Sequence, residues 1–304
     1  MTAVSRLLVV AGPTGTGKSE LALDLAERVT GEVVNGDAMQ LYRGMDIGTA
    51  KLAPAQRRGV PHHLLDVLDV TQTASVAVYQ REARAIIADV LDRGRTPILA
   101  GGSGLYLQAV VDDIGFPPTD PALRLRWEAE VERLGPERAH GRLAELDPSA
   151  AAVILPSNSR RIARALEVIE LTGQPFSASM PRPGAPAFDA LLVGLDLPTE
   201  ALDARIARRV EQMVGAGLEA EVRELLDRGL RAGRTASRAL GYPQFIEVID
   251  GRVTTDEAVA STVQATRRFV RRQRSWFRRD SRISWLDASR PDLPDAVLRL
   301  LTPP

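Results

Sequence analysis

The sequence predicts an α/β protein in which helices cover both faces of a parallel sheet and a helical domain is inserted into the chain. Short β-branched and leucine-rich runs alternate with amphipathic segments in the first part of the sequence, an alternation typical of parallel sheets. A glycine-rich stretch lies directly between the first run and the first helix. A later stretch shows helical patterns only, which indicates a separate domain.

The expected strands end beside residues that can act on a ligand. They lie at 6–11, 32–35, 63–68, 96–100 and 191–197, with a further short apolar piece at 283–286. Helical spacing is found at 18–29, 75–93, 200–228 and 255–279. Ligands bind at the carboxyl ends of parallel strands, and both Asp37 and the segment Gly101-Gly102-Ser103 follow such ends. We therefore expect these residues beside the glycine-rich stretch.

The chain is expected to divide into two domains. Arginine- and glutamate-rich helices run from 120 to about 173, and a connector rich in proline, serine and glycine follows at 175–186. The strand at 191–197 then returns to the sheet. We expect a core of residues 1–119 and 183–304, including the C-terminal helices, and a helical insertion at 120–182.

Composition narrows the classes of function. The 304 residues contain no cysteine, which excludes disulfides, zinc–thiolate sites and thiol nucleophiles. The first apolar run is too short for a secretory signal or a membrane span, so a cytoplasmic protein without a membrane partner is expected. Of the 39 basic residues only Lys18 and Lys51 are lysine, which suggests roles that arginine cannot fill. Chance retention of Lys51 stays an equal alternative.

Residues 12–19 read Gly-Pro-Thr-Gly-Thr-Gly-Lys-Ser and match the phosphate-binding pattern G-x-x-x-x-G-K-S. This pattern is credible between a strand and a helix, because glycines let backbone amides point inward and the helix end adds positive charge. Lys18 adds a full charge and Ser19 can ligate Mg²⁺. A P-loop NTPase-like sheet follows from this context. Most such loops bind nucleotides for phosphoryl transfer, and the pattern alone leaves the phosphate compound open.

Asp37 is the carboxylate expected to face the same crevice. A kinase would use it on Mg²⁺ or as a base for a hydroxyl, and a helix-capping role is an even alternative. His62 and His63 are not expected to share a metal, because adjacent residues on an extended segment point to opposite faces. No metal beyond Mg²⁺ at the loop is predicted.

The stretch 266–279 carries the strongest local charge. On a helix, Arg267, Arg271, Arg274 and Arg278 would share one face, and Phe269, Gln273 and Trp276 another. A basic stripe beside an aromatic one suits a phosphodiester backbone with unstacked bases. A helix that buries its aromatic side chains and solvates its arginines is the alternative. A second basic cluster at 160–164 favours a long anionic partner.

These stretches together resemble the tRNA dimethylallyltransferase (isopentenyltransferase) family. The matching segments, in chain order, are GPTGTGKS at 12–19, GDAMQLYRGMDIGTAK at 36–51, VPHHLLD at 60–66, SVAVYQREA at 75–83, ILAGGSGLY at 98–106, RRIARALEV at 160–168, RALGY at 238–242 and TRRFVRRQRSWFRR at 266–279. The resemblance implies transfer of a dimethylallyl group from dimethylallyl diphosphate to N6 of adenosine-37 in the anticodon loop of tRNA. The phosphate loop would then hold a diphosphate leaving group.

The resemblance also implies roles for individual residues. Asp37 would be the base, Lys18 and Arg209 would neutralise the diphosphate, and Ser103 would bond the target nucleotide. Diphosphate would contact Gly12, Pro13, Thr14, Gly15, Thr16, Gly17, Lys18 and Ser19, with Mg²⁺ at Ser19. Contacts with the tRNA anticodon stem-loop would come from Asp37, Ala38, Met39, Gln40, Ser103, Arg126, Arg160, Arg161, Arg164, Arg238, Gly241, Tyr242, Arg271, Arg272, Gln273, Arg274, Trp276 and Arg278.

The sequence departs from the family pattern at three points. Ala38 replaces the usual serine, Ser103 replaces the usual threonine, and the cysteine-bearing zinc finger of eukaryotic relatives is absent, which indicates a bacterial-type enzyme. A monomer is expected. A P-loop kinase of a small nucleotide or metabolite is the main alternative, and it leaves the basic insertion and the arginine helix unexplained. A non-catalytic RNA-binding module is a third reading.

Overall fold

The computed structural model describes residues 6–179 and 186–301. Within them the chain forms two compact units, one of residues up to Asp112 and from Pro186 onward, and one of Asp113–Ala185. We call the second unit the insertion. The sequence placed it at 120–182. None of the helices in the described residues is long and apolar enough to cross a membrane.

The first unit is built on a six-stranded parallel sheet with the order β3-β2-β4-β1-β5-β6. The strands are β1 (Leu7–Ala11), β2 (Gly31–Asn35), β3 (His62–His63), β4 (Thr96–Gly101), β5 (Ala190–Asp196) and β6 (Ser284–Asp287). The third strand is much shorter than the expected 63–68. Leu64 and Asp66 have φ angles of 59° and 58°, and this left-handed backbone ends the pairing.

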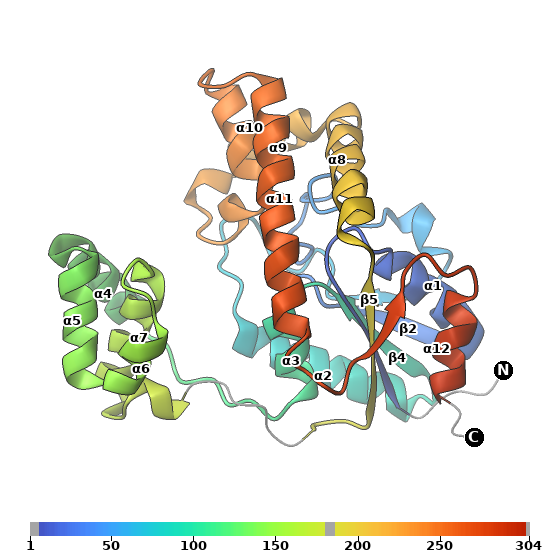
Figure 1. Ribbon diagram of the computed structural model, residues 1–304, viewed down its shortest axis with the longest axis horizontal. Helices are drawn as coiled ribbons and strands as arrows, with labels where there is room; N and C mark the ends of the chain where they lie inside the picture. Colours follow the sequence, from blue (N-terminus) through green and yellow to red (C-terminus); the bar gives the residue numbers. More distant parts are fainter. Residues whose placement is uncertain (1–5, 180–185, 302–304) are drawn as a thin grey trace. The chain divides into compact units, whose positions relative to one another are not determined.

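Helices cover both faces of the sheet, as Figure 1 shows. Those of the first unit are α1 (Lys18–Val29), α2 (Val76–Asp92), α3 (Gly104–Val111), α8 (Thr199–Gly215), α9 (Leu218–Asp227), α10 (Tyr242–Ile249), α11 (Thr255–Phe277) and α12 (Leu293–Leu301), with short 3₁₀ turns at Pro54–Arg57, Leu230–Ala232 and Ala236–Arg238. Helices α2 and α3 pack on one face, and α1 and α12 pack on the other. The buried apolar strands explain this double cover.

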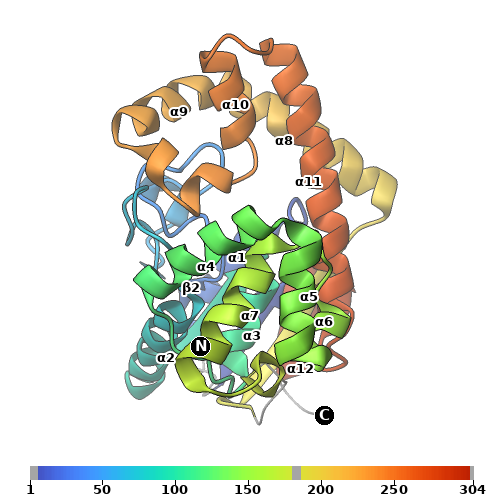
Figure 2. The same cartoon turned by 90° about the vertical axis from the view of Figure 1, so that its left-hand side faces the viewer.

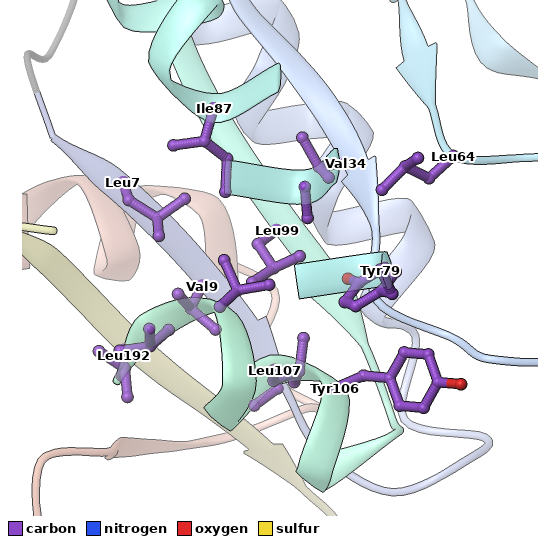
Figure 3. Close-up of a cluster of buried hydrophobic side chains, with 14 of the residues drawn as sticks. Leu7, Val9, Val34, Leu64, Tyr79, Ile87, Leu99, Tyr106, Leu107 and Leu192 are labelled. Carbon is purple, nitrogen blue, oxygen red and sulfur yellow. The ribbon is translucent and has the colours of Figure 1, made fainter. Parts of the chain in front are cut away.

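Figure 3 shows the core on the α2–α3 face, where side chains of the two helices meet those of the strands. Leu7, Val9, Val34 and Leu99 come from strands, Ile87 and Tyr79 from α2, and Leu107 and Tyr106 from α3. Burying each such side chain is worth about 1.5–3 kcal/mol. The Tyr79 hydroxyl donates a 2.8 Å hydrogen bond to the carbonyl oxygen of Asn35, which fixes the end of β2 next to Asp37.

Helices α8 to α11 form a second layer of the first unit (Figures 1 and 2). Residues 200–228, expected as one helix, are two, because Gly217 adopts a φ of 99° between α8 and α9. Helix α11 begins with a capping box in which Thr254 and Glu257 satisfy each other's backbone N–H groups. It packs against α8 and α10 of this layer and also against α3, which covers the sheet, so it links the helical layer to the sheet.

In its described residues the insertion has four α-helices with their own core. They are α4 (Pro121–Leu134), α5 (Pro136–Leu146), α6 (Pro148–Val153) and α7 (Ser159–Thr172), followed by a 3₁₀ turn at Phe176–Ser179. Buried Glu167 bonds Arg124, Arg164 and Thr119. These bonds tie α7 to α4 and to the segment that enters the insertion.

Candidate active site

The phosphate loop, residues 12–19, connects β1 to α1 and depends on its glycines. Gly12, Gly15 and Gly17 have φ angles of 143°, 91° and 85°, which L side chains disfavour. A Cβ atom on Gly12 would also lie 2.4 Å from the carbonyl oxygen of Leu195 on β5. The loop then enters α1, whose first-turn N–H groups have no partner inside the helix. The backbone therefore presents amides and a positive helix end to an anion.

Lys18 is the first residue of α1, and its ammonium lies within the loop. Its Nζ donates a 2.7 Å hydrogen bond to the carbonyl oxygen of Pro13. Burial lowers the pKa of Lys18 to about 8; the Asp37 carboxylate opposes this shift, and the Arg209 guanidinium adds to it. A bound anion would favour the charged form again, because it supplies a counter-charge.

Two cavities meet beside the loop. One, of about 280 Å³, is lined by the loop and by Gly101 and Gly102. The other, of about 370 Å³, is lined in part by apolar side chains of α8 and α11. Residues that line both are Thr14, Asp37, Thr49 and Arg209. A polar, phosphate-sized space therefore adjoins a partly apolar one, with a carboxylate and a guanidinium between them.

The loops that follow β2 and β4 touch through their backbones. A Cβ atom on Gly101 would lie 2.2 Å from the backbone of Gly36, so this approach requires glycine. The backbone N–H of Ser103 donates a 3.3 Å hydrogen bond to the carbonyl oxygen of Gly36. The contact fixes Asp37 and Ser103 relative to each other, although 66 residues separate them in the chain.

Asp37 and Ser103 each keep capacity for a ligand. One carboxylate oxygen of Asp37 accepts a 2.9 Å hydrogen bond from the backbone N–H of Met39. The Ser103 hydroxyl oxygen accepts a 3.1 Å bond from the N–H of Ala38. In the described part of the chain, the second oxygen of Asp37 and the hydroxyl proton of Ser103 are available at the cavity.

Arg209 on α8 lies across the cavities from the loop. Its Nη2 donates a 3.3 Å hydrogen bond to the carbonyl oxygen of Thr49. Burial lowers the pKa of Arg209, and the Asp37 carboxylate opposes that shift. Arginine still stays charged at this site. The buried guanidinium therefore provides a second fixed positive charge, alongside Lys18, toward the phosphate cavity.

The wall that carries Thr49 is held by Glu221 on α9. Its carboxylate accepts hydrogen bonds from the backbone N–H groups of Asp46, Ile47 and Gly48, at 2.9, 2.6 and 3.1 Å. The Tyr242 hydroxyl donates a fourth bond of 2.7 Å to the same carboxylate. One carboxylate thus joins the second helical layer to the cavity wall.

Lys51 holds the segment 42–51 in place through three oxygen acceptors. Its side chain is 3% exposed, and Nζ lies 2.6 Å from an oxygen of Asp46 and 2.6 Å from one of Asp66. A third bond of 2.7 Å goes to the carbonyl oxygen of Tyr42. A compact ammonium serves three acceptors in different directions, which a planar guanidinium does less well. This geometry favours a structural role for Lys51 over chance retention.

The arginine helix is α11, and its predicted basic face is largely paired. Arg267 lies 3.4 Å from Asp203, while Arg274 and Arg278 lie 2.8 and 3.3 Å from Asp196. Arg271 and Arg272 are exposed, and Arg272 lies over the ring of Phe269 at 5.6 Å. The exposed positive surface of α11 therefore coincides only in part with the predicted face, through Arg271 and Arg278, and also includes Arg272.

Three side chains predicted to contact tRNA are turned into the protein. Tyr242 is 0% exposed and bonded to Glu221. Gln273 is 5% exposed, with both ends of its amide bonded to loops of the sheet. Arg274 is 11% exposed and paired with Asp196. Helical periodicity shows which residues share a face and not which face is buried, and this placement argues against direct tRNA contacts by these side chains.

Other predicted tRNA contacts differ in how they relate to the cavities, and only some of them line the larger one. Ala38, Met39 and Arg238 line it, and Arg238 is exposed. Gly241 is buried at the start of α10, and Gln40 donates a 3.2 Å bond to the carbonyl oxygen of Thr49. Trp276 is 39% exposed and packs against Gly104, where a Cβ atom would lie 2.3 Å from its ring.

The remaining predicted contacts belong to the insertion. Arg161 is exposed at the start of α7. Arg126 pairs with Glu170 and lies over the ring of Trp127 at 5.8 Å. Arg164 pairs with Glu167 at 2.8 Å, and Arg160 is exposed. Arg126, Arg160 and Arg161 are thus the predicted contacts of this unit that are exposed to solvent.

Sequence reasoning missed Glu221, Gln273 as a buried tether, and the apolar lining of the larger cavity. That lining includes Ile206, Val210 and Met213 of α8 and Phe269 of α11. Their helical spacing indicated a buried face, but not that the face borders a cavity. Glu221 had no signal, because the three backbone N–H groups that it binds lie 173 to 175 residues away.

Comparison with known proteins identifies the family. The family described as IPP transferase matches residues 40–280. A Saccharopolyspora erythraea protein named tRNA dimethylallyltransferase is 63% identical, with 97% of this chain and 96% of that protein covered. A Kineococcus radiotolerans protein of the same name is 60% identical, with the same shares covered.

Comparison with solved structures points to the same family. The full-length tRNA isopentenylpyrophosphate transferase of Bacillus halodurans is 39% identical, with a TM-score of 0.71, covering 98% of this chain and 94% of that one. A eukaryotic dimethylallyltransferase acting on tRNA is 26% identical, with a TM-score of 0.80, covering 97% and 77%. These likenesses support the transferase reading and not the kinase alternative. The chain belongs to the tRNA dimethylallyltransferase, or IPP transferase, family.

Proposed function

We propose that this chain transfers the dimethylallyl group of dimethylallyl diphosphate to N6 of adenosine-37 in the anticodon loop of tRNA. The observation that carries the proposal is the pair of cavities that share Asp37 and Arg209. The phosphate cavity suits a diphosphate, and the partly apolar cavity suits the allyl group and the adenine base. The carboxylate lies where the two reactants would meet.

On the diphosphate side, the protein's task is to stabilise negative charge as the carbon–oxygen bond breaks. The loop amides, Lys18 and Arg209 supply fixed positive groups in a partly buried space, where electrostatic interactions are stronger than in water. The bond between C1 of the allyl group and the bridging oxygen breaks, and its electron pair leaves with the diphosphate. An allyl fragment delocalises the positive charge that develops at C1.

Magnesium is the proposed metal. Among the described residues no cluster of three or more His, Cys, Asp or Glu could hold an ion. The donor set nevertheless suits a phosphate-borne Mg²⁺, which keeps several waters and takes few protein ligands. The Ser19 hydroxyl, which lines the phosphate cavity in the first turn of α1, would be that ligand. When bound, the metal would neutralise part of the diphosphate charge.

On the acceptor side, Asp37 is proposed as the base. Adenine N6 is a weak nucleophile, because its lone pair is delocalised into the ring. Asp37 would orient the amine and accept one N6 proton as the new N6–C1 bond forms. The Ser103 hydroxyl would donate to the same nucleotide. The target base must leave its stack to reach the cavity.

The tRNA surface is proposed to include exposed arginines of both units. On the first unit these are Arg238, Arg271 and Arg272, with Trp276 as a stacking platform. On the insertion they are Arg126, Arg160 and Arg161, and Arg126 and Arg164 would exchange their carboxylate partners for phosphates. Contacts of this kind give salt-dependent affinity. A tRNA substrate implies a cytoplasmic enzyme, and we propose that it acts as a monomer.

The test is to incubate the protein with labelled dimethylallyl diphosphate, Mg²⁺ and unmodified tRNA, and to locate the label by nucleoside analysis. Label on N6 of adenosine-37 is the expected result. Asp37→Asn should lower turnover by about 10²–10⁴-fold, the range for a general base, while tRNA affinity stays largely unchanged. Transfer of the γ-phosphate of ATP to a small acceptor without prenylation would overturn the proposal.

A further inference from the structure

Gln273 joins three parts of the candidate site through one side-chain amide. Its Oε1 accepts a 3.0 Å hydrogen bond from the backbone N–H of Thr14 in the phosphate loop. Its Nε2 donates a 2.8 Å bond to the carbonyl oxygen of Gly102, next to Ser103. The side chain is 5% exposed and belongs to α11, the helix with the exposed Arg271 and Arg272.

The packing around the side-chain amide is close enough to require glutamine at 273 and glycine at 102. A Cβ atom on Gly102 would lie 2.5 Å from Nε2 of Gln273 and 3.4 Å from the carbonyl oxygen of Gly12. Only a side chain with a donor and an acceptor at its tip satisfies Thr14 and Gly102 together. Glutamate would offer an acceptor to both, and methionine neither a donor nor a strong acceptor.

We infer that Gln273 is a positioning residue for diphosphate and not a tRNA contact. The inference rests on the proposed function of the phosphate loop. By occupying the N–H of Thr14, Gln273 fixes the first half of the loop, so that the later amides and Lys18 stay aimed at the phosphate cavity. Its second bond holds the Gly101–Ser103 segment in register with the loop. The residue thus sets the spacing between the leaving-group site and the acceptor site.

The experiment compares Gln273→Met with Gln264→Met in the full-length protein. Gln264 is an exposed residue of the same helix, so the control repeats the chemical change without the tether. Affinity for inorganic diphosphate with Mg²⁺ is measured by calorimetry at pH 7.5 without tRNA, and affinity for tRNA is measured separately. Losing the two bonds should weaken diphosphate binding about tenfold and raise KM for dimethylallyl diphosphate, while tRNA affinity changes less than about twofold.

A second variant keeps the inference testable if Gln273→Met folds poorly. Gly102→Ala pushes the Gln273 amide away without removing it, and should weaken diphosphate binding in the same direction. The double variant should be no weaker than Gln273→Met alone, because both changes act on one contact. Unchanged diphosphate affinity in Gln273→Met, or a loss of tRNA affinity in its place, would overturn the inference. A wild-type protein that binds no diphosphate would instead overturn the proposed function.

Discussion

The lowered pKa of Lys18 predicts that diphosphate affinity depends on pH in a range where few other groups titrate. The pKa of Lys18 is about 8 in the free protein, so its side chain is mostly charged below pH 8 and mostly neutral above it. A bound diphosphate should hold the proton, so affinity tracks the protonated fraction. That fraction is about 0.9 at pH 7 and about 0.1 at pH 9, which predicts an approximately tenfold loss of affinity.

The assay is calorimetric titration with dimethylallyl thiolodiphosphate, in which sulfur replaces the bridging oxygen. Its terminal phosphate is ionised above about pH 7, so the change reports on the protein. Asp37→Asn should move the loss to lower pH, because that carboxylate opposes the shift caused by burial. In Lys18→Arg the pH dependence of binding should vanish, whatever the affinity of this variant, since arginine stays charged. A flat profile between pH 7 and 9 in the unaltered protein would refute the reasoning.

Three further predictions concern stability and tRNA binding. Glu221→Ala removes the acceptor of three backbone N–H groups, and should cost about 2–4 kcal/mol in urea unfolding; exposed Glu224→Ala should cost less than about 0.5, and equal losses would contradict the role of Glu221. Arg271→Ala should weaken tRNA binding and reduce the slope of log affinity against log salt by about 0.7–0.9, whereas an unchanged slope would return α11 to a purely structural role. Hydrogen bonding to Arg93, with help from His63, lowers the pKa of Glu32 to about 2, so its stabilisation is complete above its ordinary pKa of 4.5 and is lost as pH falls toward 2. Glu32→Gln should therefore be more destabilising at pH 7 than at pH 2.5, and equal losses at both would contradict the assignment.

Much of the fold could be predicted because its signals are local. The phosphate loop is one continuous pattern between a strand and a helix, and the buried strands are short apolar runs. Two predicted elements differ from the structure, and in both the backbone takes a positive φ angle within the predicted range. Residues 63–68 have an apolar pattern but lose strand pairing after His63 through positive φ angles at Leu64 and Asp66. The residues at 200–228 look like one helix until Gly217 divides it.

The candidate site was harder to predict, because its support comes from distant elements. Asp37, Ser103 and Lys18 follow strand ends, and strand ends of a parallel sheet converge. No sequence pattern near residue 221 indicates that its carboxylate accepts hydrogen bonds from the three backbone N–H groups at 46–48. On α11, the acidic partners Asp196 and Asp203 precede the arginines that they bind by 64 to 82 residues. Their positions decided which arginines stay exposed, and periodicity within the helix could not show it.

The scarcity of lysine has a consequence for chemical labelling. Amine-reactive probes act on neutral amines, and the two lysine side chains differ sharply in their surroundings. Lys51 is sequestered by three oxygen acceptors, whereas Lys18 has a pKa of about 8 and lies at a cavity. Acylation near pH 8 should therefore fall mainly on Lys18 among the side chains, and bound diphosphate should protect it. The ratio of acylated to unmodified Lys18, measured by mass spectrometry, then reports the occupancy of the phosphate loop in purified protein or in a cell extract.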